Sequence, residues 1–85
     1  MVSIAEMADY VFSLYHPNGK KGEDVLTTLR SYKGQIQEDN IKAGIEKLEK
    51  IVKGGILDPT NQEFHTSVMV LYSQLSKLDL DKNGS

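Results

Sequence analysis

Hydrophobic residues recur along this chain at three- and four-residue spacing in four separate segments, which is the period of an amphipathic helix. In the first segment, Ser3 and Glu6 have the spacing of a capping box, and the turn residues 16–19 stop the pattern. Its predicted buried face consists of Ile4, Met7, Ala8, Val11, Leu14 and Tyr15. The pattern predicts a first helix that begins at the capping box and ends before Pro17.

The second and third segments are also helical in pattern. The second opens near Glu23 and Asp24, whose charge suits a helix amino terminus, and contains Gly34 as a weak point. The third follows the cap candidates at 38–40 and ends at the glycine pair 54–55. The predicted buried residues are Val25, Leu29, Tyr32 and Ile36 in the second helix, and Ile41, Ile45, Leu48, Ile51 and Val52 in the third.

The fourth segment opens after Asp58. Pro59 suits the first turn of a helix, and Thr60 with Glu63 has the spacing of a second capping box. Its predicted buried face consists of Phe64, Val68, Leu71, Leu75 and Leu78, with Tyr72 at the edge. Because the connections between the four segments are short, neighbouring helices should run antiparallel. We therefore expect an all-α protein, an antiparallel four-helix bundle, with one domain over residues 1–78 and a flexible C-terminal tail over 79–85.

Composition excludes several classes of protein. The chain has 85 residues and no cysteine, so it contains no disulfide framework and no thiolate metal site. Lys and Arg number 10 against 12 Asp and Glu, and the charges are spread evenly along the chain. A nucleic-acid-binding module would cluster its cations, so we expect no nucleic-acid partner. Without a leader pattern or a 20-residue apolar run, the chain is expected to be cytoplasmic, with at most peripheral membrane contact.

Candidate chemistry is sparse. His16 lies in a turn and His65 near the start of the fourth helix, and their separation in sequence is not that of metal ligands. Residues 79–84 copy the first half of a calcium-binding EF-hand loop, but the acidic residue required at its twelfth position is missing. No nucleophile and base stand at catalytic spacing. We expect a protein that is not an enzyme and has no cofactor and no metal site.

One surface feature of the fourth helix is informative. At 100° per residue, Met69 and Val70 lie well away from the centre of the buried face. Ser67, Ser73 and Ser76 surround them where a solvent-facing helix usually carries charge, and such depletion of charge is typical of protein-binding patches. Two alternatives remain open: the helix is buried on two sides, or the patch joins two copies in a homodimer.

The order of these features resembles that of the intracellular immunity proteins that protect lactic acid bacteria from their own pediocin-like (class IIa) bacteriocins. The resemblance rests on the pair Leu14-Tyr15, the turn at Pro17, the apolar positions of the middle helices and the final-helix stretch 67–77. Within that stretch, Leu71-Tyr72 and Gln74-Leu75 are its most specific elements. The middle-helix positions are Val25, Leu26, Leu29, Ile45, Leu48 and Ile51.

The resemblance implies a four-helix bundle that recognises a bacteriocin-loaded mannose phosphotransferase permease and blocks the lethal pore. It places specificity in the carboxy-terminal half, which here includes the connection 54–57. The predicted partner-binding residues are Met69, Val70, Ser73, Ile56 and Leu57. The alternative function is that of a small phage or bacterial regulatory adaptor or antirepressor, which would use the same helical face to bind another protein.

Overall fold

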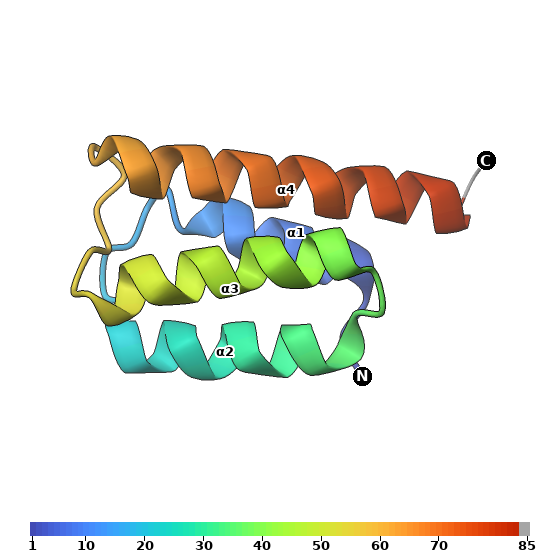
Figure 1. Cartoon of the computed structure of the whole chain (residues 1–85), viewed down its shortest axis with the longest axis horizontal. Coiled ribbons are helices and arrows are strands. Elements are labelled where there is room, and N and C mark those ends of the chain that lie inside the picture. Colours follow the sequence, from blue (N-terminus) through green and yellow to red (C-terminus); the bar gives the residue numbers. More distant parts are fainter. Residues whose placement is uncertain (84–85) are drawn as a thin grey trace.

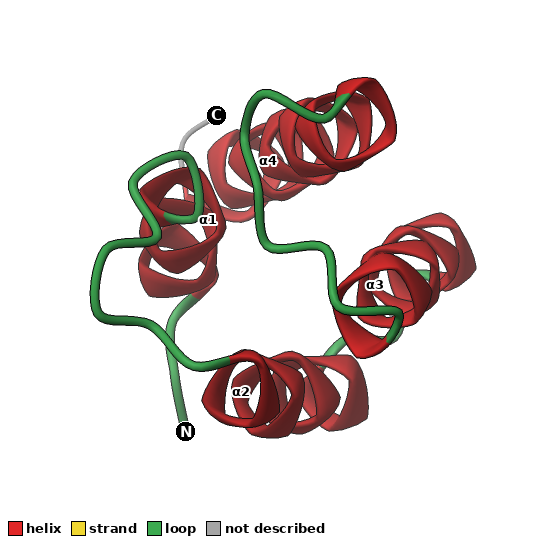
Figure 2. Ribbon diagram, turned by 90° about the vertical axis from the view of Figure 1, so that its left-hand side faces the viewer, coloured by secondary structure: helices red, strands yellow, loops and turns green. Residues whose placement is uncertain are grey.

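The computed structural model describes residues 1–83, which form four α-helices and no strand. The helices are α1 (Ile4–Ser13), α2 (Gly22–Gln35), α3 (Asp39–Lys53) and α4 (Gln62–Asn83). Each runs antiparallel to the one before it (Figure 1), and seen end-on they stand at the four corners of a bundle (Figure 2). The predicted all-α four-helix bundle is therefore confirmed.

Helix ends follow the sequence signals closely at two places. Ser3 Oγ accepts a hydrogen bond from the Glu6 amide at 3.1 Å, while the Glu6 carboxylate accepts one from the Ser3 amide at 3.3 Å. At the end of α3, Gly55 has a φ of 93°, and the Ile56 amide donates to the Ile51 carbonyl at 3.2 Å. This is a Schellman motif, in which a glycine with positive φ satisfies the last carbonyls of a helix.

The predicted start of α4 is wrong. Thr60 does not cap the helix, because its amide and its hydroxyl both donate to the Asp58 carboxylate, at 2.9 and 2.7 Å. Asn61 is the residue before the first helical position, and its Oδ1 accepts from the Phe64 amide at 3.0 Å. The Asp58 turn therefore leaves the capping position to Asn61. The two hydrogen bonds from Thr60 also lower the pKa of Asp58.

The other end of α4 differs from the expected domain boundary at residue 78. The helix continues to Asn83, so five residues assigned to the tail, 79–83, are helical. After Gly55, the sequence contains no glycine before Gly84 and no proline after Pro59, so nothing breaks the helical pattern earlier. Residues 84–85 of the expected tail lie outside the described part of the chain.

The core lies between the four helices and matches the predicted faces closely. Close contacts join α1 to α4, α4 to α3 and α3 to α2. Between α1 and α2, the rings of Tyr10 and Tyr32 meet edge-to-face at 5.7 Å. Three residues predicted as core are only half-buried, namely Ile4, Tyr15 and Leu78. The buried apolar residues are Met7, Ala8, Val11, Leu14, Val25, Leu29, Tyr32, Ile36, Ile41, Ile45, Leu48, Ile51, Val52, Phe64, Val68, Leu71 and Leu75.

A glycine permits the close approach of α3 to α4. A Cβ atom added at Gly44 would lie 3.0 Å from Gln74 Oε1 and 3.4 Å from Leu71 Cδ1. At Gly34, by contrast, an added Cβ would meet no atom within 4 Å. Both glycines lie within helices. The same substitution at the two positions therefore separates the effect of crowding on stability from the effect of helix propensity.

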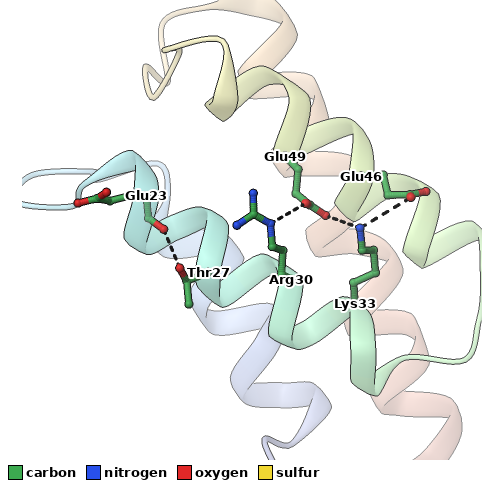
Figure 3. Close-up of polar contacts among 6 residues, drawn as sticks. All are labelled: Glu23, Thr27, Arg30, Lys33, Glu46 and Glu49. Carbon is green, nitrogen blue, oxygen red and sulfur yellow. Dashed lines mark hydrogen bonds and ion pairs between the residues drawn. The ribbon is translucent and has the colours of Figure 1, made fainter.

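Ion pairs join α2 to α3 (Figure 3). Lys33 Nζ lies 3.0 Å from Glu49 Oε1 and 3.7 Å from Glu46 Oε2, and Arg30 Nε lies 3.7 Å from Glu49 Oε2. The short contact is an ion pair, so the attraction there is between charges. The Glu49 side chain is only 14% exposed, whereas that of Glu46 is 59% exposed.

Gly44 should not tolerate a branched side chain. We expect Gly44→Val to lower the free energy of unfolding by about 1–3 kcal/mol, because the added methyl groups press on Gln74 and Leu71. Gly34→Val is the matched control and should change stability by less than about 0.5 kcal/mol, since the site is open. Urea denaturation followed by circular dichroism measures both. Equal losses at the two positions would contradict the close approach.

The two glutamates that form ion pairs between α2 and α3, Glu46 and Glu49, should contribute differently to the free energy of unfolding. We expect Glu49→Gln to cost about 1–2 kcal/mol, because it leaves Arg30 and Lys33 near each other without their shared carboxylate. Glu46→Gln should cost about 0.5 kcal/mol or less, as is usual for an exposed pair. Denaturation at low and at 1 M salt measures the difference, and a cost at Glu49 that salt does not reduce would count against an electrostatic origin.

Candidate functional site

An apolar groove lies on the outer surface between the end of α1 and the first half of α4. Its volume is about 550 Å³, which falls within the usual range for binding pockets. One wall is formed by the end of α1 and the residues that follow it, and the other wall is formed by α4. The lining residues are Phe12, Tyr15, His16, His65, Met69, Tyr72 and Ser73.

Helical spacing brings these side chains together. On α4, Met69, Tyr72 and Ser73 stand four, seven and eight positions after His65, so they share one face. After Ser13 the chain keeps turning, because the amides of 14, 15 and 16 donate to carbonyls three residues earlier at 2.9–3.1 Å. These tighter turns keep Tyr15 and His16 beside the helix that carries Phe12.

The aromatic rings of the groove pack on one another. The Phe12 ring lies 5.4 Å from that of Tyr15 and 5.1 Å from that of Tyr72, between ring centroids. The Tyr15 ring in turn lies 5.1 Å from the imidazole of His65. The Tyr15 hydroxyl donates to the His65 carbonyl at 3.3 Å, and burial raises the pKa of this phenol. The Tyr15 ring is thus tied to the backbone of α4, and its phenol stays neutral at physiological pH.

The groove is lined mainly by apolar and aromatic side chains. None of its lining residues is an Asp, Glu, Lys or Arg, and α4 carries none of these from Phe64 to Ser76. Its titratable side chains are the imidazoles of His16 and His65 and the phenols of Tyr15 and Tyr72. Within residues 1–83, no group of three His, Asp or Glu stands close enough to hold a metal ion. The arrangement suits an apolar partner surface.

The structure places Met69 and Val70 on the surface, as the helical pattern predicted. Their exposed fractions are 48% and 45%, so burial of α4 on two sides is excluded. Met69 and Ser73 line the groove, whereas Val70 does not. The two exposed residues therefore serve as a matched pair, since their exposure is nearly equal but only Met69 contacts the hollow.

Ile56 and Leu57 are not brought to the groove. Both are half-buried and pack against the core, and Ile56 forms part of the Schellman motif after α3. Their side chains therefore have a structural role in the α3–α4 connection. A role for them in partner binding stays a prediction.

Ser67 was expected beside the outer patch, and this prediction is wrong. The residue is 6% exposed, and its hydroxyl has no hydrogen-bond partner within residues 1–83. It lies three residues after Phe64 and four before Leu71, which places it between two core residues of the same helix face. A small hydroxyl side chain there fits the packing, although its polarity suggested a surface position.

The acidic sequence at 79–84 does not form a calcium-binding loop in its described part. Asp79 and Asp81 lie within α4, where residues two apart point about 200° away from each other. Two carboxylates on opposite faces of a helix do not act as ligands of the same ion.

The groove residues that sequence reasoning missed are the aromatic and imidazole side chains. Phe12 is 48% exposed and lies off the predicted buried face of α1. Its spacing to Tyr15 and His16, three and four positions, was the available signal. Only the antiparallel packing of α1 on α4 shows that these residues face His65 and Tyr72.

Comparison with known proteins adds no relative: no family model, curated protein or solved structure matches this chain. Among residues 1–83, none of the helices combines the length and apolar character needed to cross a bilayer.

Met69 should be dispensable for folding. We expect Met69→Lys to change the free energy of unfolding by no more than about 0.5 kcal/mol, because the side chain is half-exposed. Leu71→Ala, two residues away on the buried face, should cost about 2–5 kcal/mol. Chemical denaturation of both variants tests the contrast, and a loss above 2 kcal/mol for Met69→Lys would show that the groove belongs to the core.

Proposed function

We propose that this protein is a bacteriocin immunity protein, a non-enzymatic, cytoplasmic binding protein that recognises a bacteriocin-loaded membrane receptor. The observation that carries the proposal is the uncharged apolar groove of about 550 Å³ on an otherwise charged bundle. The resemblance of the helix pattern to the class IIa immunity proteins supplies the biological setting, with a mannose phosphotransferase permease as receptor.

Immunity of this kind requires that the protein bind one state of the pore more tightly than the other, and it involves no chemical reaction. A binding protein shifts a pore between open and blocked states only as far as it prefers one of them. A ten- to hundredfold preference corresponds to about 1.4–2.8 kcal/mol. Burial of one or two side chains such as Met69 and Phe12 is worth a similar amount, so a groove of this size is sufficient.

The regulatory adaptor or antirepressor is the second candidate. The same observation supports it, because an adaptor also needs only a rigid scaffold and an accessible apolar face. The two candidates differ in the partner: a membrane permease for immunity, and a regulator or enzyme outside the membrane for the adaptor. Affinity capture from the native host, with the Met69→Lys variant as the control bait, separates them.

Protection from killing is the direct test of immunity. We expect expression of the chain in a bacteriocin-sensitive strain to protect against at least one of a panel of pediocin-like peptides. Met69→Lys should lose at least tenfold of that protection at equal expression, since it places a charge in the apolar groove. Lys47→Ala, an exposed change on α3, is the matched control and should protect fully. Unchanged killing by the whole panel would contradict the proposal.

A further inference from the structure

Five residues on one flank of α4 are placed symmetrically about Val70. Two precede it by seven and four positions, and two follow it by four and seven. At 100° per residue, all five fall within an arc of about 80° around the helix. Spacing of three and four residues along such an arc is the pattern with which helices pack side by side. We call this set the α4 seam: Glu63, Thr66, Val70, Gln74 and Lys77.

The α4 seam has opposite charges at its two ends. Glu63 and Lys77 are exposed, and neither has an ion-pair partner within 4 Å in the described part of the chain. Val70 lies midway between them and is 45% exposed. Thr66 and Gln74 are uncharged and half-buried. A surface with an apolar centre, an acid at one end and a base at the other is complementary to a partner with the reverse order of charge.

A second copy of α4 has that reverse order when it runs antiparallel. If a two-fold axis passes beside Val70, Glu63 of each copy faces Lys77 of the other. Each of these charges lies seven residues from Val70, or about 10 Å along the helix. Helices that cross at about 20° diverge by only a few Å over that length, so the two long side chains reach each other. A parallel arrangement would instead place like charges together, so the charges favour the antiparallel one.

The α4 seam is separate from the apolar groove. No residue of the seam lines the groove, whereas Met69 and Ser73 do. At 100° per residue, Met69 lies about 100° and Ser73 about 60° around α4 from Val70. Contact between two copies along the seam therefore does not require the groove, and it is independent of the proposed function.

We infer that this chain forms a symmetric homodimer through the α4 seam. Val70 of each copy lies at the two-fold axis, and two reciprocal ion pairs between Glu63 and Lys77 fix the antiparallel direction. The seam spans 15 residues of one helix in each copy, about 22 Å, so the contact is smaller than the roughly 800 Å² per partner of a standard interface. The dimer is therefore weak, with an expected dissociation constant between about 10 μM and about 1 mM.

Sedimentation of the full chain tests the dimer directly. Between about 10 μM and about 1 mM protein at low salt, we expect a reversible change from monomer to dimer. Amide resonances of the seam should shift with protein concentration, and about 0.5 M salt should weaken association severalfold because it screens the ion pairs. A chain that stays monomeric at 1 mM, or concentration-dependent shifts confined to another face, would overturn the inference.

Charge reversal tests the pairing of the two ends. Glu63→Lys and Lys77→Glu should each weaken association about tenfold or more, because each turns two attractive contacts into two repulsive ones. An equimolar mixture of the two variants should associate within about threefold of the unmodified chain, since opposite charges face each other again in the mixed dimer. Glu23→Lys is the matched control, because Glu23 is also exposed and in the first turn of its helix, and it should have no effect. A mixture that stays monomeric, or equal weakening by Glu23→Lys, would refute the pairing.

The two exposed apolar residues of α4 separate the seam from the groove. Val70→Lys should prevent association up to about 1 mM, because it brings two cations together at the axis, whereas Met69→Lys should weaken it less than about twofold. The reverse order of effects would show that the groove joins the copies and would overturn the inference.

Protection from bacteriocin distinguishes this inference from the proposed function. If the unmodified chain is monomeric and Val70→Lys abolishes protection, another protein occupies the seam. That result would overturn the dimer but leave the immunity function standing. Dimerisation through the seam without protection by any variant would do the reverse.

Discussion

The bundle depends on α4 burying one apolar stripe against α1 and α3 at the same time. Phe64, Val68 and Leu71 are fully buried, and no disulfide supplements this packing. Gly44 allows α3 to approach α4 closely, and Ser67 is buried among the core residues of α4. Since α4 contacts two neighbours, its position fixes the seam that carries the apolar groove.

The two sides of the bundle are held together differently. Between α2 and α3 the surface carries ion pairs, with Lys33 between two glutamates, around a smaller hollow of about 180 Å³. Between α1 and α4 the surface above the core has aromatic rings and hollows instead. Charged side chains shield apolar surface from solvent on the first side, whereas none of the residues that line the apolar groove is an Asp, Glu, Lys or Arg.

Much of the fold was predictable, because periodicity and caps are local signals. The buried faces of α2 and α3, the Ser3 capping box and the stop at Gly55 all follow from residues within one or two turns. Thr60 failed as a cap because Asp58 binds both its donors. The groove was only half predictable: Met69 follows from the helical wheel of α4, whereas Phe12 meets Tyr72 only through tertiary packing.

Contacts between the side chains of its walls make the apolar groove rigid. Its walls are two helices whose opposite faces form the core, and the aromatic contacts of Phe12, together with the hydrogen bond from Tyr15 to the His65 carbonyl, fix the wall side chains relative to α4. A preformed site avoids the entropy cost of ordering side chains when a partner binds. A small apolar groove with few anchors can then discriminate between partners, because little of its binding free energy is spent on ordering.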